Sequence, residues 1–593
     1  MKLALGSLLV PLLGAVLLPA CLAVPDETPA MCEATEDCES GEICDDGVCW
    51  GNPPQGDFAA IISPPAERTT LISRELASVT ISPDGWIERV QLEKPITYTA
   101  QLVCQAPLAC DASMLAATIT VSRPSSFLGG PGFRSVVKTK NGTPFTISVP
   151  PAHDAYTSYT VTVVPEGREA TAINQTTPAQ LLPPLRTQLT IDASASGKVL
   201  ELGGIALPRV SGVIKNDSGE PQANYRVVAI GRWDYNSTPT EVSTVDFTGV
   251  DGTFSIQLSS GLTRDVELVA RPLVTTTRPT LRHAGDFGQT GVANLDLAWP
   301  TGVGNKLDLD IPVNAVDGNG EVKPARGARV IVSARTAAPN GEATYIAEAT
   351  TDDRGRARLA VLDGPAFVAA GYRISIVPQA NSTAGVMYDQ PLSILLPITE
   401  KRLRTRFALR GVVRLRGEGV KDMSVTARPS LRFVWSLDPE DQTFVTAIPP
   451  STTVTPESGE FVLWVDPNLA DTWGHYDLTL EAASGSMAPN TTIASIEVPR
   501  VSSQTTVTLG IFDLPEPAYV RGSIVDDKGD AVEGAELKLF RTEDFSSLCR
   551  EVAHAPANCA AVALAASLLG RGASNANGEV RLTLPRMRLD PSE

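Results

Sequence analysis

Histidines supply much of the acid, base and metal chemistry of proteins, and this chain has only four of them. They lie far apart in the sequence, at His153, His283, His475 and His554. The chain contains no HExxH zinc motif, no GxSxG nucleophile elbow, no Walker phosphate loop and no dinucleotide-binding glycine motif. The sequence therefore predicts a protein without catalytic activity, bound metal or cofactor.

Cysteines offer the other chemistry, and eight of the nine fall into three local groups. The first group is Cys32, Cys38, Cys44 and Cys49, within a segment of 18 residues. Such a short segment cannot build a core without cross-links, and it lacks the CxxC pairs of zinc sites. Disulfides are therefore expected. Of the three possible pairings we favour first with third and second with fourth. Cys104 with Cys110, and Cys549 with Cys559, are each expected to close a small loop.

The ninth cysteine, Cys21, follows an apolar stretch from Leu3 to Leu18 that is preceded by Lys2. The stretch is too short to span a membrane and is typical of a cleaved signal peptide over residues 1–20. Its end, LPAC, resembles the lipobox of bacterial lipoproteins, which implies a lipid anchor on Cys21. Leu22 after the cysteine implies the outer membrane. The four-cysteine group resembles motifs that follow the lipobox in lipoproteins of myxobacteria. An ordinary secretory signal is the alternative.

The segment between Lys2 and Arg68 holds eleven acidic residues and no basic one, in a chain of formal net charge −18. This balance excludes nucleic-acid binding by phosphate neutralisation. We interpret residues 21–67 as the anchor, the cysteine-rich motif and a solvated linker, with GNPPQGDFAAIISPPAE as the linker proper. The alternative is that the acidic motif binds Ca²⁺, although it lacks the ligand spacing of an EF-hand loop.

Three short phrases recur along the rest of the chain. The first is a glycine turn followed by alternating apolar residues, at Asp251–Leu258, Arg354–Val361, Ser458–Val465 and Asn577–Leu584, with a looser copy at Asn141–Val149. The second is a strand that runs into a turn, at Gly212–Gly219, Val313–Gly320, Gly411–Gly419 and Gly522–Gly529. The third begins with an aromatic residue or Asp, at Tyr159–Val163, Asp265–Val269, Tyr372–Val377 and Tyr476–Leu480. Their spacing predicts repeats of about 100 residues, the size of a seven-stranded β-sandwich.

These phrases resemble the carboxypeptidase regulatory-like family of transthyretin-like β-sandwiches, most closely over residues 210–272 and 520–585. The resemblance implies a structural or binding module and no peptidase activity. An all-β chain of five tandem Ig-like or transthyretin-like sandwiches is expected, at residues 68–185, 186–300, 301–402, 403–512 and 513–593. The last one carries an insertion with a helix near Cys559–Leu569 and shows no closing strand, so it is incomplete or borrows a strand.

One module concentrates aromatic residues of the kind on which sugars stack, namely Trp435, Trp464, Trp473 and Tyr476. Strand alternation places Trp464 on the face opposite Phe461 and Leu463. The aromatic set predicts either a ligand platform or ordinary core packing, and core packing is favoured.

Two functions follow from these observations. The first is an exported, lipid-anchored rod in the cell envelope with a structural or protein-interaction role, including adhesion. The second is a carbohydrate-binding surface lipoprotein. The partner, protein or glycan, is not specified by the sequence.

Overall fold

The computed structural model describes residues 32–586 except for the following gaps: 39, 41, 46, 54–57, 105–115, 126–131, 141–142, 152–157, 167–181, 191–197, 203–207, 234–238, 260–261, 263–265, 274–277, 286, 288–290, 317–319, 380–381, 431–432, 435–444, 446–447, 449, 467–473, 484, 499–505 and 542–567. The described part is built almost wholly of β-strands, which confirms the predicted all-β fold of sandwich modules.

Five modules share one arrangement of seven strands in two sheets; in the second module the third strand is in two short parts, and the third and fourth modules each have one further short strand directly after the first. In one sheet the third, second, fifth and sixth strands lie side by side in that order. In the other sheet the fourth, first and seventh do. The seventh strand runs parallel to the first in every module, whereas the other neighbouring strands of a module are antiparallel. Because side chains alternate along each strand, the inward-facing apolar residues of the two sheets meet in one core.

The first module packs its core around Tyr98, Ile119, Val161 and Leu182, all of them buried. Its strands alternate strictly, as in β7, where every second residue is buried. In chain order they are β6 (Ile96–Cys104), β7 (Ala117–Arg123), β8 (Phe133–Thr139), β9 (Phe145–Val149), β10 (Ser158–Pro165), β11 (Leu185–Thr190) and β12 (Lys198–Leu202).

The second and third modules are fused by a continuous sheet and share one hydrophobic core. The sixth strand of the second module pairs with the third strand of the third module, where Leu281 lies opposite Ala343. The second module consists of β13 (Arg209–Lys215), β14 (Tyr225–Gly231), β15 (Thr240–Glu241), β16 (Asp246–Phe247), β17 (Thr253–Gln257), β18 (Val266–Pro272), β19 (Thr280–Gly285) and β20 (Val292–Ala298). The third consists of β21 (Lys306–Val316), β22 (Val322–Pro324), β23 (Arg329–Ala338), β24 (Gly341–Thr350), β25 (Arg356–Leu362), α2 (Pro365–Ala370), β26 (Tyr372–Val377), β27 (Met387–Leu392) and β28 (Lys401–Leu403).

The fourth module has its own core, with Leu409, Val425, Leu463 and Leu478 fully buried. Its strands are β29 (Phe407–Leu415), β30 (Glu418–Gly419), β31 (Ser424–Pro429), β32 (Ser451–Val454), β33 (Glu460–Val465), β34 (Gly474–Glu481), β35 (Thr491–Val498) and β36 (Thr506–Asp513).

The last module, called the closing module from here on, is assembled from both ends of the chain. Residues 517–585 supply its first four strands: β37 (Pro517–Val525), β38 (Glu536–Arg541), β39 (Leu568–Ala573) and β40 (Glu579–Pro585). The fifth, sixth and seventh come from the N-terminal region: β3 (Phe58–Ser63), β4 (Arg74–Val79) and β5 (Val90–Gln91). Strand β3 pairs with β38, and β5 pairs with β37 in the parallel register that seventh strands adopt elsewhere. The sequence predicted that this module is incomplete or borrows a strand, and the structure shows that it takes strands from the N-terminal region.

Two sequence interpretations change as a result. The segment around Phe58–Ser63 is a strand between β38 and β4, with Ala60 and Ile62 fully buried, so its interpretation as a linker was wrong. The proline and glycine residues on either side mark the ends of a short buried strand. The first module also begins at β6 and not at residue 68, because residues 58–92 pack into the closing module.

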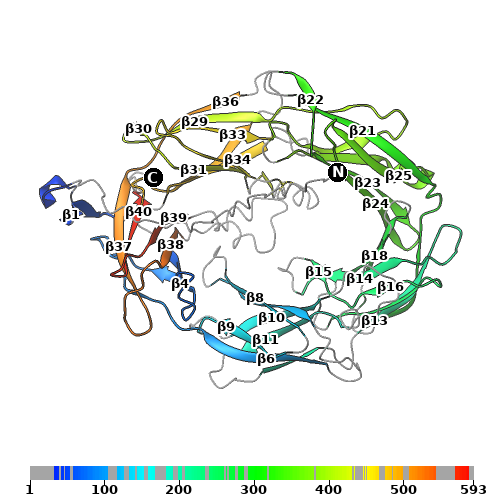
Figure 1. Cartoon of the computed structure of the whole chain (residues 1–593), viewed down its shortest axis with the longest axis horizontal. Helices are drawn as coiled ribbons and strands as arrows, with labels where there is room; N and C mark the ends of the chain where they lie inside the picture. Colours follow the sequence, from blue (N-terminus) through cyan, green and yellow to red (C-terminus); the bar gives the residue numbers. More distant parts are fainter. Residues whose placement is uncertain are drawn as a thin grey trace, which may run out of the picture.

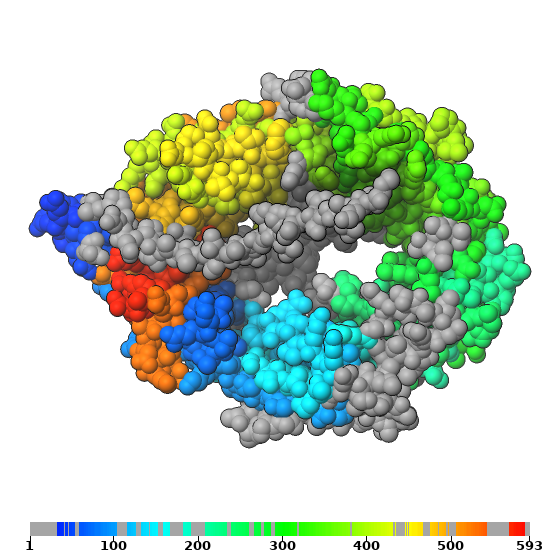
Figure 2. All heavy atoms as spheres, in the orientation of Figure 1, coloured from blue at the N-terminus to red at the C-terminus, as the bar shows by residue number. Residues whose placement is uncertain are grey.

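The molecule is a closed ring. Figures 1 and 2 show the modules following one another around a central opening, with blue N-terminal strands beside orange and red C-terminal strands. The expected straight rod was therefore wrong. The recurring sequence phrases predict the strands within one module. They do not predict the angle between one module and the next.

The recurring phrases correspond to fixed positions in the module. The glycine-turn phrase leads into the fourth strand, at β17, β25, β33 and β40. Its glycines, Gly252, Gly355, Gly459 and Gly578, have φ angles of 69°, 72°, 72° and 75°, a conformation that glycine adopts without strain. The second phrase forms first strands, and the third phrase forms fifth strands.

Candidate functional site

The cysteine-rich motif folds as a small disulfide-linked hairpin that follows the short helix η1 (Thr35–Asp37). Its strands are β1 (Glu42–Asp45) and β2 (Val48–Gly51). Cys32 is bonded to Cys44 and Cys38 to Cys49, which confirms the favoured pairing. These sulfurs lie close together, but each is used in a disulfide and is not a free thiolate for a metal.

The hairpin docks onto the first strand of the closing module. Trp50 is 2% exposed and pairs in parallel register with Tyr519 of β37. The guanidinium of Arg521 lies between two indole rings, 4.8 Å from the centre of Trp50 and 4.3 Å from that of Trp86. Arg581 covers Trp50 at 5.5 Å. Each such contact contributes about 0.5–2 kcal/mol, depending on its desolvation. We call the hairpin with these three side chains, Arg521, Arg581 and Trp86, the clasp.

Ion pairs join the two ends of the chain at the clasp. Asp45 contacts Arg521, with 2.5 Å between the carboxylate and guanidinium atoms, and Glu42 pairs with Arg586. A third acidic side chain, Asp37, accepts the backbone N–H groups of Glu33 and Ala34, which lowers the pKa of its carboxyl. Three acidic residues of the motif thus have protein partners, and Ca²⁺ binding there stays a prediction.

The predicted aromatic platform is only partly present among the described residues. Trp464 lies on the outer face of β33, opposite the buried Phe461 and Leu463, as the alternation predicted. Tyr476 is 4% exposed, and its hydroxyl donates to the backbone oxygen of Asp466 at 2.9 Å. Burial raises the pKa of the Tyr476 phenol far above its usual range. A buried ring cannot stack on a sugar, so Tyr476 belongs to the core, as the favoured interpretation expected, and not to a ligand platform.

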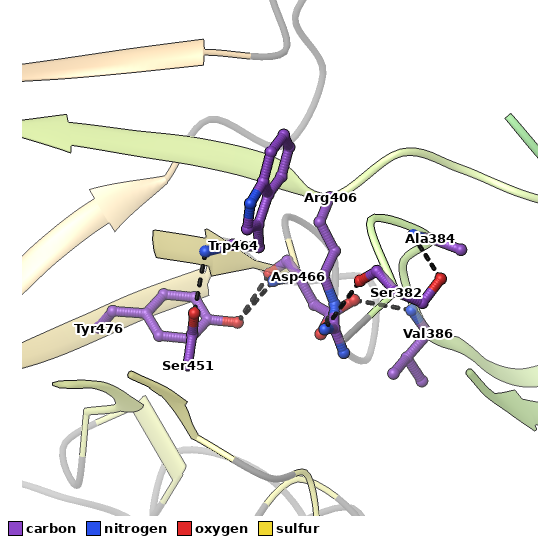
Figure 3. A network of polar contacts seen from close by, with 8 residues as sticks. All are labelled: Ser382, Ala384, Val386, Arg406, Ser451, Trp464, Asp466 and Tyr476. Carbon is purple, nitrogen blue, oxygen red and sulfur yellow. Dashed lines mark hydrogen bonds and ion pairs between the residues drawn. The ribbon is translucent and has the colours of Figure 1, made fainter. Parts of the chain in front are cut away.

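A buried polar network next to Trp464 joins the third and fourth modules (Figure 3). Arg406 and Asp466 form an ion pair at 3.2 Å, with side chains 6% and 5% exposed. Asp466 also accepts the backbone N–H of Val386, from the third module, at 2.7 Å. Burial raises the pKa of Asp466, and the Arg406 charge opposes that rise. The space beside the network, about 10 Å³, is too small for a sugar. The network therefore fixes the joint between two modules.

Several predicted features lie outside the described residues: residues 1–20, Cys21, Cys110 as the partner of Cys104, the pair Cys549 with Cys559, Trp435, Trp473 and most of the predicted helix near Cys559–Leu569. Of that helix, Leu568 and Leu569 begin strand β39. Among the helices that the structure describes, none has the length and apolar character required to cross a membrane.

The chain matches no protein-family profile and no curated protein. Among solved structures, a streptococcal ancillary pilin is 8% identical over 51% of this chain and 98% of its own, with a TM-score of 0.17. The shaft pilin SpaA from Lactobacillus rhamnosus GG is 10% identical over 35% of this chain and 97% of its own, with a TM-score of 0.15. A 9R-lipoxygenase from Cyanothece PCC8801 is 13% identical over 19% of this chain and 17% of its own length, with a TM-score of 0.12. Similarities at these TM-scores say nothing about function.

The splitting of the closing module between the two ends of the chain was missed at the sequence level. One signal pointed to it, because the phrase typical of fifth strands has no copy after Asn577–Leu584. The fifth strand of that module is β3, whose sequence FAAIIS begins with the aromatic Phe58, as copies of that phrase do, but lies at the opposite end of the chain. A module that lacks a strand at one end of the chain, together with an unassigned apolar segment at the other end, indicates a module that is split between the two ends.

Proposed function

We propose that this protein is a non-catalytic scaffold of the bacterial cell envelope, anchored by a lipid on Cys21 and serving a structural or adhesive role. One observation carries the proposal. The chain uses three N-terminal strands to complete its last module, and this gives a closed ring in which no module is left at a free end. A ring closed in this way holds the faces of five sandwiches in fixed relation, which suits a protein that presents binding surfaces.

The position of the anchor supports the same proposal. Cys21 precedes the first cysteine of the clasp hairpin, Cys32, by only 11 residues. The hairpin is stapled by two disulfides, which persist in oxidising compartments outside the cytosol. A lipid on Cys21 would thus tether the ring at its closure point. The net charge of −18 disfavours nucleic acids as partners.

Fractionation tests the anchor. The wild-type chain is expected in the outer-membrane fraction, and Cys21→Ser is expected to move it to the soluble fraction of the envelope. The double variant Cys32→Ser/Cys44→Ser is the matched control, because it removes two cysteines but keeps the lipidation residue. Membrane retention of Cys21→Ser would overturn the anchor.

Cross-linking in intact cells tests the scaffold role. Wild-type protein is expected to yield discrete adducts with an envelope or matrix partner. Ile62→Asp, which buries a charge in the closing module, should abolish these adducts while the lipid anchor is kept. Ile61→Asp lies on the opposite face of β3 and should retain them. Identical adducts in all three proteins would contradict a function that depends on the closed ring.

Protease treatment of intact cells then shows whether the ring faces outward.

A second candidate, carbohydrate binding, rests on Trp464 alone, since its indole lies on the solvent side of β33 and points away from Tyr476 (Figure 3). It predicts that Trp464→Ala abolishes retention on a glycan array without lowering thermal stability. A glycan-binding wild type with an equally active Trp464→Ala variant would exclude Trp464 as the platform.

A further inference from the structure

A pocket of about 230 Å³ lies between the fourth module and the closing module, beside the clasp. Its fourth-module side is the turn between β34 and β35, which includes Met487 and Asn490. The other side is formed by β2, β37, β39 and β40 of the closing region. Thr583 on β40 donates a hydrogen bond to the backbone oxygen of Ser486 at 2.9 Å, which holds the two sides together. Val48 and Trp50 come from the N-terminal hairpin, so the pocket is complete only while that hairpin is docked on β37 and the ring is closed.

One wall of the pocket is apolar and rigid. Trp50 is 2% exposed and Val48 is 4% exposed, and Met487 packs against both of them together with Tyr519. Trp50 is fixed further by the Arg521 guanidinium on its ring and by a hydrogen bond from its indole nitrogen to the backbone oxygen of Asp45, at 2.9 Å. Met487 is the partly exposed member of this wall, so the apolar body of a ligand can pack on it at little entropic cost.

The closing-region side of the pocket carries hydrogen-bond donors without acceptors. The Nε atom of Arg571 on β39 is buried and has no hydrogen-bond partner in the described part of the chain. The hydroxyl of Tyr519, another lining residue that is 9% exposed, is likewise buried without a partner there. Leaving such a group unpaired costs about 1–3 kcal/mol, so the Nε atom of Arg571 points to an absent acceptor.

The charges of the pocket favour an anion. Among the lining residues the one acidic side chain is Glu579, and it forms an ion pair with Arg581 at 3.7 Å. Arg571 forms no ion pair within the residues that the structure describes, so its positive charge is not compensated by the pocket. The amide oxygens of Asn490 and Asn575 accept backbone N–H groups, which leaves their NH₂ groups as further donors.

We propose that this pocket binds a small organic acid with an apolar body, whose carboxylate pairs with Arg571 and whose body packs on Met487, which itself packs against Trp50. A carboxylate accepts the planar fork of a guanidinium in a two-bond arrangement, and burial strengthens that pair. The bound acid contacts the fourth module, β39 and the clasp at once. It stabilises the closed ring, because the open ring has no such pocket.

Binding of 1-naphthoate, measured by titration calorimetry on the full-length chain, tests the proposal. The wild type should bind it with its ring closed, and 1-naphthalenemethanol, which has the same body but no charge, should bind at least tenfold more weakly. Arg571→Gln should weaken naphthoate binding at least tenfold. Arg354→Gln, in an exposed turn of the third module, is the matched control and should leave the affinity unchanged.

Further variants keep the test decisive. Arg571→Lys keeps the charge and should retain part of the affinity if Arg571→Gln folds poorly. Met487→Trp fills the apolar side of the pocket without changing Arg571 and should block binding. Thermal unfolding of each variant reports whether it is folded. The proposal is overturned if the folded wild type fails to bind millimolar naphthoate, or if naphthoate binds equally well to wild type and Arg571→Gln.

Discussion

The fourth module and the closing module have the same strand order but different chain connectivity. In the fourth module all seven strands follow one another between Phe407 and Asp513. In the closing module four strands from the end of the chain pair with three from its beginning, and Arg89 donates to the backbone oxygen of Gly529 across 440 residues. The sandwich is therefore specified by the pattern of its strands and not by an unbroken chain.

The energetic difference between the two modules is smaller than their connectivity suggests. Loop-closure entropy grows with the logarithm of loop length, so closing over 440 residues costs only about 1 kcal/mol more than closing over one module. The kinetic difference is larger, because distant pairings form late in folding. The closing module should therefore be the last to form and the first to be lost.

Removal of the N-terminal strands should have the largest effect. A chain that starts at Glu93 lacks β3, β4 and β5, and the remaining half of the closing module then exposes Leu537, Leu539 and Leu582. Residues 517–585 should become sensitive to protease and the radius of gyration should rise, while the fourth module stays protected. Separately produced residues 32–92 should restore protection. Protection of residues 517–585 in the truncated chain would show that the split strands are dispensable.

The joint between the third and fourth modules depends on a buried charge pair, whereas the closing module is held by an apolar core. Asp466→Ala leaves the buried Arg406 without its counter-ion and should destabilise the fourth module by about 3–5 kcal/mol in chemical denaturation. The control is Glu348→Ala, which breaks the exposed pair with Arg329 and should cost less than about 1 kcal/mol. Equal costs would mean that burial of the first pair is energetically unimportant.

Matched core substitutions compare the two kinds of module directly. Ile62→Ala in the closing module and Leu409→Ala in the fourth each remove a fully buried side chain and should each cost about 2–5 kcal/mol. Only Ile62→Ala should increase the population of open rings, measured by small-angle scattering and by hydrogen exchange of residues 517–525. Ring opening by Leu409→Ala to the same extent would refute the distinction.

Alkaline pH should weaken the first and third modules. Burial raises the pKa of Tyr159 in the first module to about 12, and burial also raises the pKa of Tyr345 in the third to about 12. A tyrosine in the unfolded chain ionises near pH ~10, so the folded state holds these protons more tightly. Stability is then unchanged below about pH 10 and falls as the pH rises toward 12. Tyr159→Phe should flatten this decline for the first module, as followed by circular dichroism and tyrosinate absorbance.

The sequence was a good guide to single modules and a poor one to their assembly. Glycine turns such as the one at Gly459, with alternating residues after it, have a purely local physical cause, so the fourth strands were found. The cysteine pairing was also found, because four cysteines allow few choices. The fusion at Leu281 and Ala343 depends on two edge strands meeting, which no local pattern records.

In the candidate site, too, the sequence predicted local features and missed contacts between distant residues. Alternation placed Trp464 on the outer face of its strand, but it said nothing about Tyr476, whose ring fills the core next to Asp466. The docking of Trp50 on Arg521 joins residues hundreds of positions apart. The pocket beside them follows from that docking, and so it was also invisible to an analysis of spacing along the chain.

The parallel pairing of first and seventh strands gives every module the same head-to-tail polarity. A head-to-tail contact joins two different surfaces. When the contact is repeated with a rotation that returns to the first copy, it makes a ring. When the repetition does not close, it makes a filament. Here five unequal copies close within one polypeptide, and the final contact is the split sandwich. If strands β3 to β5 were donated to a neighbouring molecule in place of their own chain, the same pairing would join protomers end to end. The segment that carries β3 to β5 would thus decide between a cyclic monomer and a domain-swapped polymer.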